Sequence, residues 1–320
     1  MWSGEPATSP AVSVVVPVFN AEATLGRTLA ALAQQEVDVP FEVIVVDDGS
    51  SDGSLEVARA AGPGVQVIEG ARAGAAEARN RGAAAASAPL IAFTDSDCFP
   101  TAGWLRETLS ALRHADLVQG RVDPEPGRPL GHFDRSLWVH EAGGFYETAN
   151  LTVRRELFER LGGFEGWLRH SGRPFGEDIW FGWRAVRAGA RTGFARDAVV
   201  HHAVFERGAG DYMLERLRLE HFPAVTRKIP EFRERAAFLS VFLSRRTAAF
   251  DAALAGAAVA LVRRSPVWLI AAAPYASMLA PRARLARRRA PWVAAVDLAA
   301  DLVGFAALVR GSVRHRSLLL

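Results

Sequence analysis

Two pairs of acidic side chains follow apolar runs and are the residues best suited to chemistry. Asp47 and Asp48 precede a turn rich in glycine and serine, and Asp95 and Asp97 flank a single serine. Two carboxylates at a strand end can hold a hard divalent cation, which in turn binds a diphosphate. Taken alone, the first pair is equally explained by turn chemistry and helix capping, and the second pair is short enough to recur by chance. Whether these acids form a site therefore depends on where the neighbouring strands and helices place them.

A parallel sheet would bring both pairs together. Roughly the first hundred residues alternate β-branched runs with alanine-rich stretches at helical spacing, as in an α/β domain. Ligands of such sheets bind beyond the carboxyl ends of the strands, so we expect both acidic pairs at one edge. The expected strands are 12–18, 41–47, 65–68 and 90–94. The expected helices are 21–35, 54–61 and 73–86.

Beyond residue 94 the pattern is less regular. A later block, residues 142–202, mixes glycines, aromatics and charges, a composition typical of a site lining. A proline- and glycine-rich loop precedes this block and is able to move, and Gly189 ends its last helix as a left-handed stop. The pattern predicts helices at 101–113, 154–161 and 178–188. It predicts a strand at 116–122 and the loop at 123–132.

The composition fits a globular protein with a large core. Half of the 320 residues are hydrophobic and 23% are charged, which argues against disorder. A net charge of +3 carries no whole-chain signature of nucleic-acid binding. Cys98 is the single cysteine, which excludes an intrachain disulfide and fits a reducing compartment. The N-terminus shows no positively charged leader, so we expect a cytoplasmic protein.

Five blocks in order resemble family 2 glycosyltransferases of the GT-A fold, over residues 11–205. The resemblance implies a mostly parallel sheet flanked by helices, a nucleotide diphosphate sugar donor, an acceptor hydroxyl on a glycan or a lipid-linked carrier, inversion, and Mn²⁺ or Mg²⁺ as cofactor. By family analogy, the setting is cell-surface or lipid-linked glycan synthesis. The blocks are VVVPVFNAEATL (14–25), VIVVDDGSSDGS (43–54), GAAEARNRGAAAASAPLIAFTDSDC (74–98), ANLTVRRELFERLGGFEG (149–166) and GEDIWFGWRAVRAG (176–189).

The resemblance over residues 11–205, together with the apolar stretches and arginine-rich turns of the last block, divides the chain into four parts. An N-terminal tail (1–10) precedes a donor-binding half (11–115) and an acceptor-binding and catalytic half (116–247). The last part (248–320) is a helical tail, expected to be membrane-associated.

Eight residues form the donor site that the resemblance implies. The loop after the first strand lies against the nucleotide, Asp48 reads the base, and the Ala-Arg-Asn block pairs with the diphosphate. Asp97 is the direct metal ligand, and Asp95 supports the metal or contacts the donor's ribose or sugar. The family often has a further aspartate where this chain has Cys98, which leaves one fewer oxygen near the metal. For the loop after the first strand the alternative is a turn that starts a helix, and for Arg79 it is a solvent-exposed arginine on a helix. The residues are Pro17, Asn20, Glu22, Asp48, Arg79, Asn80, Asp95 and Asp97.

Asp178 is the expected catalytic base, with Glu177 as the second candidate. A carboxylate at a helix start can take the proton of the acceptor hydroxyl, although an acidic first turn also satisfies the helix dipole. His201 and His202 follow on an apolar strand, where related enzymes often place a metal ligand, and neutral imidazole suits manganese. Only one of two adjacent strand residues can face the site. The sequence leaves that choice open, and a core histidine remains an equal alternative for either.

The basic excess is concentrated in the tail, which has ten arginines and two acids from Gly256 onward. Its apolar stretches are each shorter than the roughly 20 uninterrupted residues that a membrane span needs. Arginines flank them, so we expect helices that lie peripherally on an anionic membrane surface, at the inner face of the cell membrane. In the last helix, Asp297 and Asp301 share one face. A helical bundle packed on the enzyme and a hairpin dipping into the bilayer are the alternatives. The residues expected on another face are Trp292, Val296, Ala299, Val303 and Ala306.

Two other functions compete with sugar transfer. A nucleotidyltransferase also uses acidic metal ligands on a parallel sheet, but it generally has a glycine-rich basic loop after the first strand, and PVFNAEATL has none. A scaffold that binds nucleotide sugars without turnover is the other rival, and the presence of Arg79, Asp97 and Asp178 argues against it. Neither the donor sugar nor the acceptor follows from the sequence.

Overall fold

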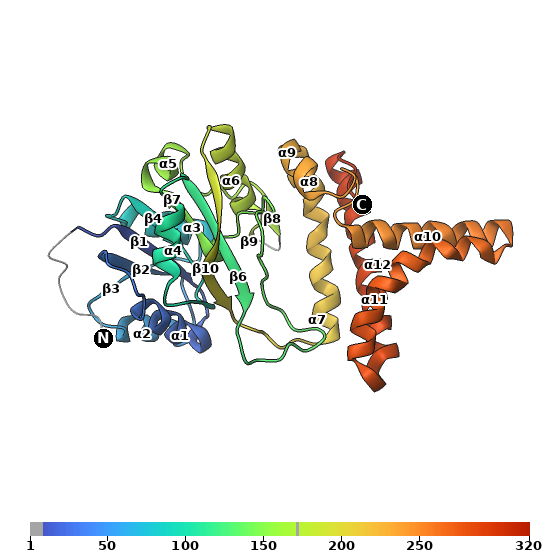
Figure 1. Ribbon diagram of the computed structural model, residues 1–320, viewed down its shortest axis with the longest axis horizontal. Coiled ribbons are helices and arrows are strands. Elements are labelled where there is room, and N and C mark those ends of the chain that lie inside the picture. Colours follow the sequence, from blue (N-terminus) through green and yellow to red (C-terminus); the bar gives the residue numbers. More distant parts are fainter. Residues whose placement is uncertain (1–8, 171–172) are drawn as a thin grey trace. The chain divides into compact units, whose positions relative to one another are not determined.

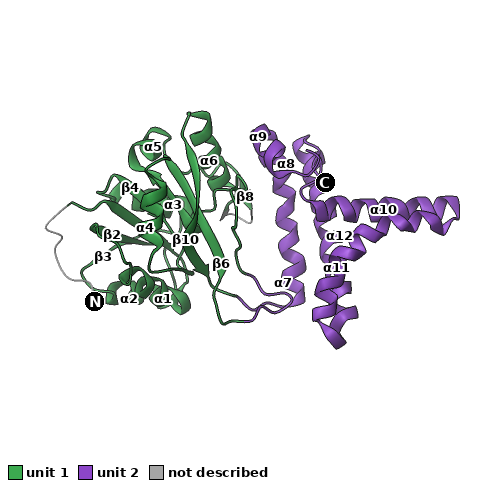
Figure 2. Cartoon of the chain, in the orientation of Figure 1, with its two compact units in different colours: residues 1–128, 136–204 green, residues 129–135, 205–320 purple. Residues whose placement is uncertain are grey.

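The computed structural model describes residues 9–170 and 173–320, in two compact units (Figure 2). Unit 1 holds the residues up to 128 together with 136–204, and unit 2 holds 129–135 together with 205–320. Most of the expected N-terminal tail, residues 1–8, lies outside the described residues.

Unit 1 is built on an eight-stranded mixed sheet in the order β3-β2-β1-β4-β7-β6-β10-β5 (Figure 1). Six strands share one direction, whereas β7 and β5 run antiparallel to their neighbours. The central strand β1 is buried along its whole length, as its run of valines requires. The prediction of a mostly parallel sheet is confirmed. The strands are β1 (Val12–Val18), β2 (Phe41–Asp47), β3 (Val65–Glu69), β4 (Leu90–Phe93), β5 (Cys98–Pro100), β6 (Leu117–Pro124), β7 (Leu151–Arg154) and β10 (Thr192–His202).

Helices cover this sheet; α3 packs on β1 and β2, and α4 packs on β10 (Figure 1). A separate two-stranded ribbon joins β8 (Arg169–His170) to β9 (Arg173–Pro174). Every helix expected between residues 21 and 188 is found, with ends shifted by a few residues. The helices of unit 1 are α1 (Glu22–Ala33), α2 (Ser54–Ala60), α3 (Ala75–Ala85), α4 (Trp104–Ala111), α5 (Arg155–Arg160) and α6 (Glu177–Arg187), with the 3₁₀ helix η1 (Thr148–Asn150).

Asn150 ties together the part of the sheet that carries the site. The pairing of β10 with β6 shifts register between Ala195 and Val199, and such an irregularity leaves backbone groups unpaired. The buried Asn150 amide donates to the carbonyls of Ala198 (2.8 Å) and Arg121 (2.9 Å). Its oxygen accepts from the indole of Trp104 at 2.9 Å. One side chain thus links β6, β10 and α4.

Unit 2 is helical, and its longest helix, α12, packs closely on η2. A Cβ built on Gly311 would lie 2.1 Å from the carbonyl oxygen of Glu220, so this contact requires glycine. The helices of unit 2 are α7 (Ala209–Leu214), η2 (Glu215–His221), α8 (Phe222–Lys228), α9 (Pro230–Ala236), α10 (Arg245–Arg263), η3 (Pro266–Ala272), α11 (Ala273–Leu285), η4 (Arg287–Arg289) and α12 (Ala290–His315).

The acidic residues of α12 lie on its buried face. Asp297 is fully buried and accepts from the Tyr212 hydroxyl at 2.8 Å, while Asp301 accepts from Arg246 at 2.9 Å and from Tyr275 at 2.6 Å. The expected division of this helix is therefore wrong for Val296, which is buried beside Asp297. Packing against η2, α7 and α8, rather than polarity, decides which face is covered.

One helical segment of unit 2 is long and apolar enough to cross a membrane. The segment Arg287–His315 meets this test by length and composition, and 39% of its most apolar window is buried within the protein. The sequence prediction counted only uninterrupted apolar stretches, which Asp297 and Asp301 break. The whole helix is nevertheless long and apolar enough when these two acids are tolerated.

Candidate functional site

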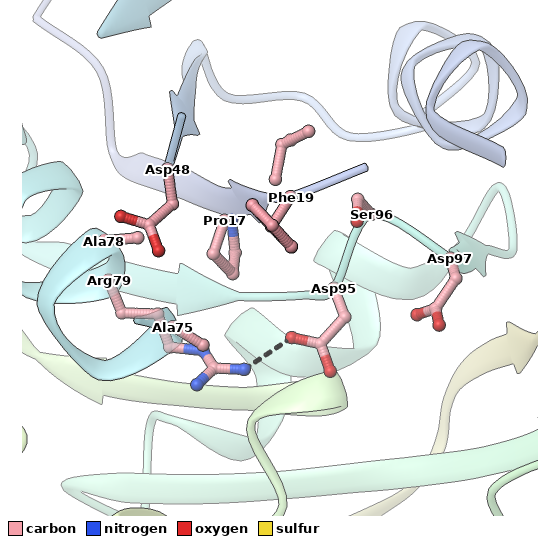
Figure 3. Close-up of a pocket in the computed structure, with 10 residues that line it drawn as sticks. Pro17, Phe19, Asp48, Ala75, Ala78, Arg79, Asp95, Ser96 and Asp97 are labelled. Atoms are coloured by element: carbon pink, nitrogen blue, oxygen red, sulfur yellow. Dashed lines mark hydrogen bonds and ion pairs between the residues drawn. The ribbon is translucent and has the colours of Figure 1, made fainter. Parts of the chain in front are cut away.

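A pocket of about 240 Å³ opens at the carboxyl edge of the sheet in unit 1 (Figure 3). Asp48 follows β2, while Asp95 and Asp97 follow β4, and all three line this pocket with Pro17 and Arg79. The expected meeting of the two acidic pairs at one edge is thus found. Figure 3 shows Asp48 on one chain segment and Asp95 and Asp97 on another, all lining this pocket.

Backbone amides hold Asp48 in place. Its two carboxylate oxygens accept from the amides of Ala73 and Gly74, each at 2.7 Å. Gly74 has a φ of +100°, which a side-chain-bearing residue rarely adopts, so glycine is required there. Asp47 instead accepts from the amides of Gly49 and Ser50 and stabilises the turn. The two neighbouring acids therefore differ: Asp48 lines the pocket, and Asp47 shapes the loop beside it.

Arg79 links the pocket to the acidic end of α6. Its Nη2 donates to Asp95 at 2.7 Å, and its Nη1 lies 3.6 Å from Glu177. Burial lowers the pKa of Arg79, but the charges of Asp95 and Glu177 outweigh this effect and raise it. A buried, permanently charged guanidinium between these carboxylates offers a partner for further anionic groups. Its Nε has no hydrogen-bond partner in the described part of the chain.

Asp178 has the electrostatic surroundings of a general base. It lies in the first turn of α6, after Gly176 in a left-handed conformation. Withdrawal from water raises the pKa of Asp178 well above the usual carboxylate range, and the charges of Glu177 and Glu147 raise it further. Arg79 opposes the shift. A carboxylate with a raised pKa is a stronger proton acceptor, which is what an acid–base catalyst near neutral pH needs.

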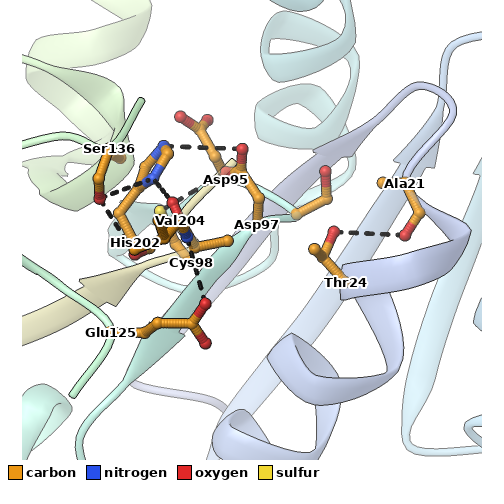
Figure 4. A network of polar contacts seen from close by, with 12 residues as sticks. Ala21, Thr24, Asp95, Asp97, Cys98, Glu125, Ser136, His202 and Val204 are labelled. Carbon is orange, nitrogen blue, oxygen red and sulfur yellow. Dashed lines mark hydrogen bonds and ion pairs between the residues drawn. The ribbon is translucent and has the colours of Figure 1, made fainter. Parts of the chain in front are cut away.

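His202 and Asp97 face each other at the far end of the site (Figure 4). The β5–β10 register places Cys98 opposite His202, and His202 Nε2 lies 3.6 Å from Asp97 Oδ2. His202 Nδ1 lies 2.7 Å from the carbonyl oxygen of Ala203, which can only accept, so Nδ1 carries the proton. In the neutral tautomer with the proton on Nδ1, Nε2 carries a lone pair that faces the Asp97 carboxylate. Such a pair of acceptors suits a divalent cation such as Mn²⁺.

Cys98 completes this group, and its thiol is a poor ligand. Ligand atoms of Asp97, Cys98 and His202 all lie within 4.8 Å of one another. Burial raises the pKa of the Cys98 thiol well above its ordinary value, and the charges of Asp95 and Asp97 add to this shift. A neutral thiol binds metals weakly, because the thiolate is the ligand. The oxygen of Asp97 and the nitrogen of His202 are thus the better donors.

The other histidine points away from this cluster. His201 and His202 alternate on β10, and His201 Nδ1 is buried without a hydrogen-bond partner among the described residues. Of the two histidines, His202 is the one that lies beside Asp97 and Cys98.

Three of the predicted donor-site residues brace the loops around the pocket. Asn20, with a φ of +52°, accepts from the Ser51 amide at 2.8 Å, and Glu22 accepts from the Gly53 amide at 3.0 Å. Asn80 donates to the Phe164 carbonyl and accepts from the Phe164 amide, each at 2.8 Å. Direct contact of these three side chains with a donor stays a prediction.

Two polar residues near the site were not predicted. Glu147 precedes η1, and burial raises its pKa; its carboxylate accepts from Gln119. Ser136 donates to the His202 carbonyl at 3.2 Å, and its hydroxyl also lies 3.5 Å from the ring nitrogen Nδ1. Both stand in irregular segments, where no periodicity marks which side chains turn inward. The one signal in the sequence was the position of Glu147, an acid two residues before the ANLTV block of the family.

The family model and the named relatives that match this chain are all glycosyltransferases. The family described as "Glycosyl transferase family 2" matches residues 13–171. Glycosyltransferase AglE of Haloferax volcanii is 31% identical over 227 residues, which cover 66% of this chain and 72% of that protein. Pre-mycofactocin glycosyltransferase of Mycobacterium tuberculosis is 32% identical over 60% of this chain. Validoxylamine A glucosyltransferase of Streptomyces hygroscopicus is 29% identical over 62% of this chain. The chain spans 42% and 52% of the lengths of these last two relatives.

Two solved structures share the fold. Mannosyltransferase PcManGT from Pyrobaculum calidifontis, in complex with GDP-Man and Mn²⁺, has a TM-score of 0.56 at 23% identity, covering 97% of this chain and 89% of its own. S. aureus TarS 1–349, in complex with UDP, has a TM-score of 0.51 at 21% identity, covering 96% and 92%. At these identities the likeness establishes the architecture of the chain.

Proposed function

Because the chain belongs to glycosyltransferase family 2, we propose that it transfers a sugar with inversion, with the help of a divalent cation, from a nucleoside diphosphate donor to an acceptor hydroxyl. The chain has the GT-A fold, and its named relatives are glycosyltransferases. The observation that carries the proposal is the meeting of Asp48, Arg79, Asp95 and Asp97 in one pocket, with Arg79 bridging to the carboxylates of α6.

The donor nucleotide is proposed to lie against the edge formed by Pro17 and Asp48. A carboxylate held by two amides keeps a fixed orientation and can accept the imide N–H of a base such as uracil. Arg79 supplies positive charge toward the diphosphate. The structural neighbours were solved with UDP and with GDP-Man, which supports a nucleotide site here without selecting the base.

Asp97 and His202 are the proposed ligands of Mn²⁺ or Mg²⁺, with Asp95 in support. The unprotonated Nε2 beside a carboxylate oxygen fits such an ion, and PcManGT was solved with Mn²⁺. When bound, the cation would neutralise charge on the departing diphosphate. His201 belonged to the expected ligand set and, since its ring lies outside the cluster, is left out of this proposal.

Asp178 is proposed as the general base. The acceptor oxygen bonds to the anomeric carbon as its proton passes to Asp178, while the bond from that carbon to the diphosphate oxygen breaks and the electron pair leaves with the diphosphate. Glu177 contributes by raising the pKa of Asp178 and by holding Arg79, and it remains the second candidate for the base. Glu147 adds a further negative charge on the same side.

The acceptor is proposed to be a glycan or a lipid-linked carrier at the inner face of the cell membrane. This part of the proposal rests on the helical unit 2 and on family analogy. It assigns the enzyme to cell-surface or lipid-linked glycan synthesis.

Hydrolysis of a panel of nucleotide sugars, with and without Mn²⁺, tests the chemistry. We expect cation-dependent release of the nucleoside diphosphate from one donor class and loss of cation-dependent donor binding in Asp97→Ala. Unchanged donor affinity in that variant would remove the metal role. Donor binding without any hydrolysis or transfer would instead favour the scaffold that binds without turnover.

A further inference from the structure

Unit 2 exposes large apolar side chains where a soluble protein buries them. Residues on both sides of the turn between α10 and η3 are largely exposed, with Leu261 at 80% and Ile270 at 76% of their surface. A contiguous exposed apolar group of this kind marks a contact with a partner or a membrane. We call these residues the tail surface; they are Leu261, Val262, Val267, Trp268, Leu269 and Ile270.

The tail surface sits on a tight antiparallel hairpin. A Cβ built on Gly256 of α10 would lie 2.6 Å from the carbonyl oxygen of Trp268 and 2.7 Å from Ala271 Cβ. The two arms therefore touch through backbone at this point, and the large side chains are left pointing outward. Gly256 permits this close approach of the two arms, and the side chains of Trp268 and Ile270 are not buried between them.

The last helix also leaves large apolar side chains exposed. Trp292, Leu298 and Leu302 of α12 are each about half exposed, on the face opposite Asp297 and the glycines that pack on η2. The buried face of this helix holds Val293, Val296 and Leu308 together with Asp297, and the three large apolar side chains are left over on its outer face. Unit 2 thus presents apolar surface from two separate elements.

Exposed arginines stand at the hairpin turn and again at the far end of α11. Between Ala252 and Val296 the chain has seven arginines and no acidic residue. Arg263 and Arg264 stand at the hairpin turn, and Arg284 and Arg287–Arg289 stand at the end of α11. These six are exposed. Within residues 9–170 and 173–320, none of the six forms an ion pair with an acid.

We infer that the tail surface docks peripherally on an anionic lipid bilayer, with its apolar side chains in the headgroup and upper acyl region and its flanking arginines on lipid phosphates. Apolar side chains beside exposed arginines are the pattern of interfacial membrane segments. A second copy of this chain is the weaker occupant, because a symmetric contact would bring the same arginine clusters against each other without acids to pair them. The inference stands apart from the proposed sugar transfer.

Vesicle flotation of the full-length protein tests this inference. Trp268→Glu/Ile270→Glu removes the apolar anchor, and Arg287→Gln/Arg288→Gln/Arg289→Gln removes three charges. Matched controls are Leu214→Glu/Leu239→Glu, at two other exposed leucines of unit 2, and Arg113→Gln/Arg160→Gln/Arg196→Gln, at three exposed arginines of unit 1. Vesicles are phosphatidylcholine alone or mixed with phosphatidylglycerol.

We expect flotation with the anionic vesicles and little with phosphatidylcholine alone. Each lost arginine should weaken binding about fivefold at low salt. The apolar double variant should stay with the soluble fraction, and both controls should float like the parent protein. Carbonate at alkaline pH should release the bound protein.

Three outcomes would overturn the inference. Equal flotation of the parent and the apolar variant would exclude the tail surface as the anchor. Retention after carbonate would indicate a membrane span. A lipid-free dimer that the apolar variant converts to monomer, without flotation of either, would assign the surface to contact between copies. Normal donor hydrolysis by the variants separates loss of docking from loss of fold.

Discussion

Asp178 and Glu177 are adjacent carboxylates with different surroundings. Replacing Asp178 by Asn keeps the shape of the side chain and removes its ability to accept a proton. We expect turnover to fall by about 100- to 10,000-fold, with donor affinity nearly unchanged. Steady-state transfer rates and donor titrations measure the two effects separately. Near-normal rates in Asp178→Asn, with a large loss in Glu177→Gln, would reverse the two roles.

The raised pKa of Asp178 predicts a pH dependence of transfer. Activity requires the deprotonated base, so it should fall, as pH decreases, at a higher pH than an ordinary carboxylate would give. Glu177→Gln removes a like charge, lowers the pKa of Asp178, and should move the acid limb of the rate profile to lower pH. Glu147→Gln should move it less, since its charge contributes less to the shift. An acid limb that neither variant moves would contradict this assignment.

The two adjacent histidines provide a matched pair for the metal site. His202→Ala removes the nitrogen that faces Asp97, and we expect Mn²⁺ to bind at least on the order of tenfold more weakly. His201→Ala should leave Mn²⁺ affinity within about twofold, because its ring lies outside the cluster. Calorimetric titration with Mn²⁺ measures both. Equal losses would show that folding of β10, rather than ligation, is affected.

At this scale the sequence predicted which residue types meet and left open which of the two adjacent histidines lies beside Asp97. The meeting of Asp48, Asp95 and Asp97 was predictable because parallel strands end at one edge, whereas Arg79, on α3, was predicted from the family resemblance. The choice of His202 was not, because it depends on the pairing of Cys98 with β10, a long-range register that no local pattern contains. Glu147 was missed because a loop has no periodicity.

At the scale of elements, Asn150 holds an irregular sheet together. Asn150→Ala removes hydrogen bonds to the Ala198 and Arg121 carbonyls and to the Trp104 indole, leaving buried groups unsatisfied. We expect the free energy of unfolding to fall by about 2–4 kcal/mol. Urea unfolding of the parent and variant, followed by tryptophan fluorescence, measures the change. A loss below about 0.5 kcal/mol would mean that water replaces the amide there.

Elements with strong periodicity were predictable, and short paired strands were not. The buried run of β1 and the alanine-rich α3 carry their own pattern. By contrast, β5 has three residues and β7 has four, and both exist because neighbouring strands offer unpaired edges. Arg154 was assigned to a helix because the following residues are good helix formers; the structure ends β7 there and starts α5 one residue later.

At the scale of the whole molecule, α12 offers a buried and an exposed ion pair on one helix. Asp297→Ala leaves the guanidinium groups of Arg246 and Arg282, 3.5 and 3.2 Å away, without this partner. Breaking such a buried pair should destabilise unit 2 by about 3–5 kcal/mol. Arg310→Ala breaks only the exposed contact to Glu220 and should cost less than about 1 kcal/mol. Hydrogen exchange of α12 amides distinguishes the two, and equal exchange rates would contradict the ranking.

The chain passes between the two units at three points, after residues 128, 135 and 204. The short segment 129–135 is anchored within unit 2, where Arg282 donates to the His132 carbonyl and Arg135 bridges to Phe205. The helical part is thus encoded in two pieces of the gene. A graft of this part onto a relative must carry both pieces, and after a protease nick at Val204 the N-terminal fragment would still contribute residues 129–135 to unit 2. Unit 2 therefore cannot be transferred complete to another protein by fusing residues 205–320 to its end.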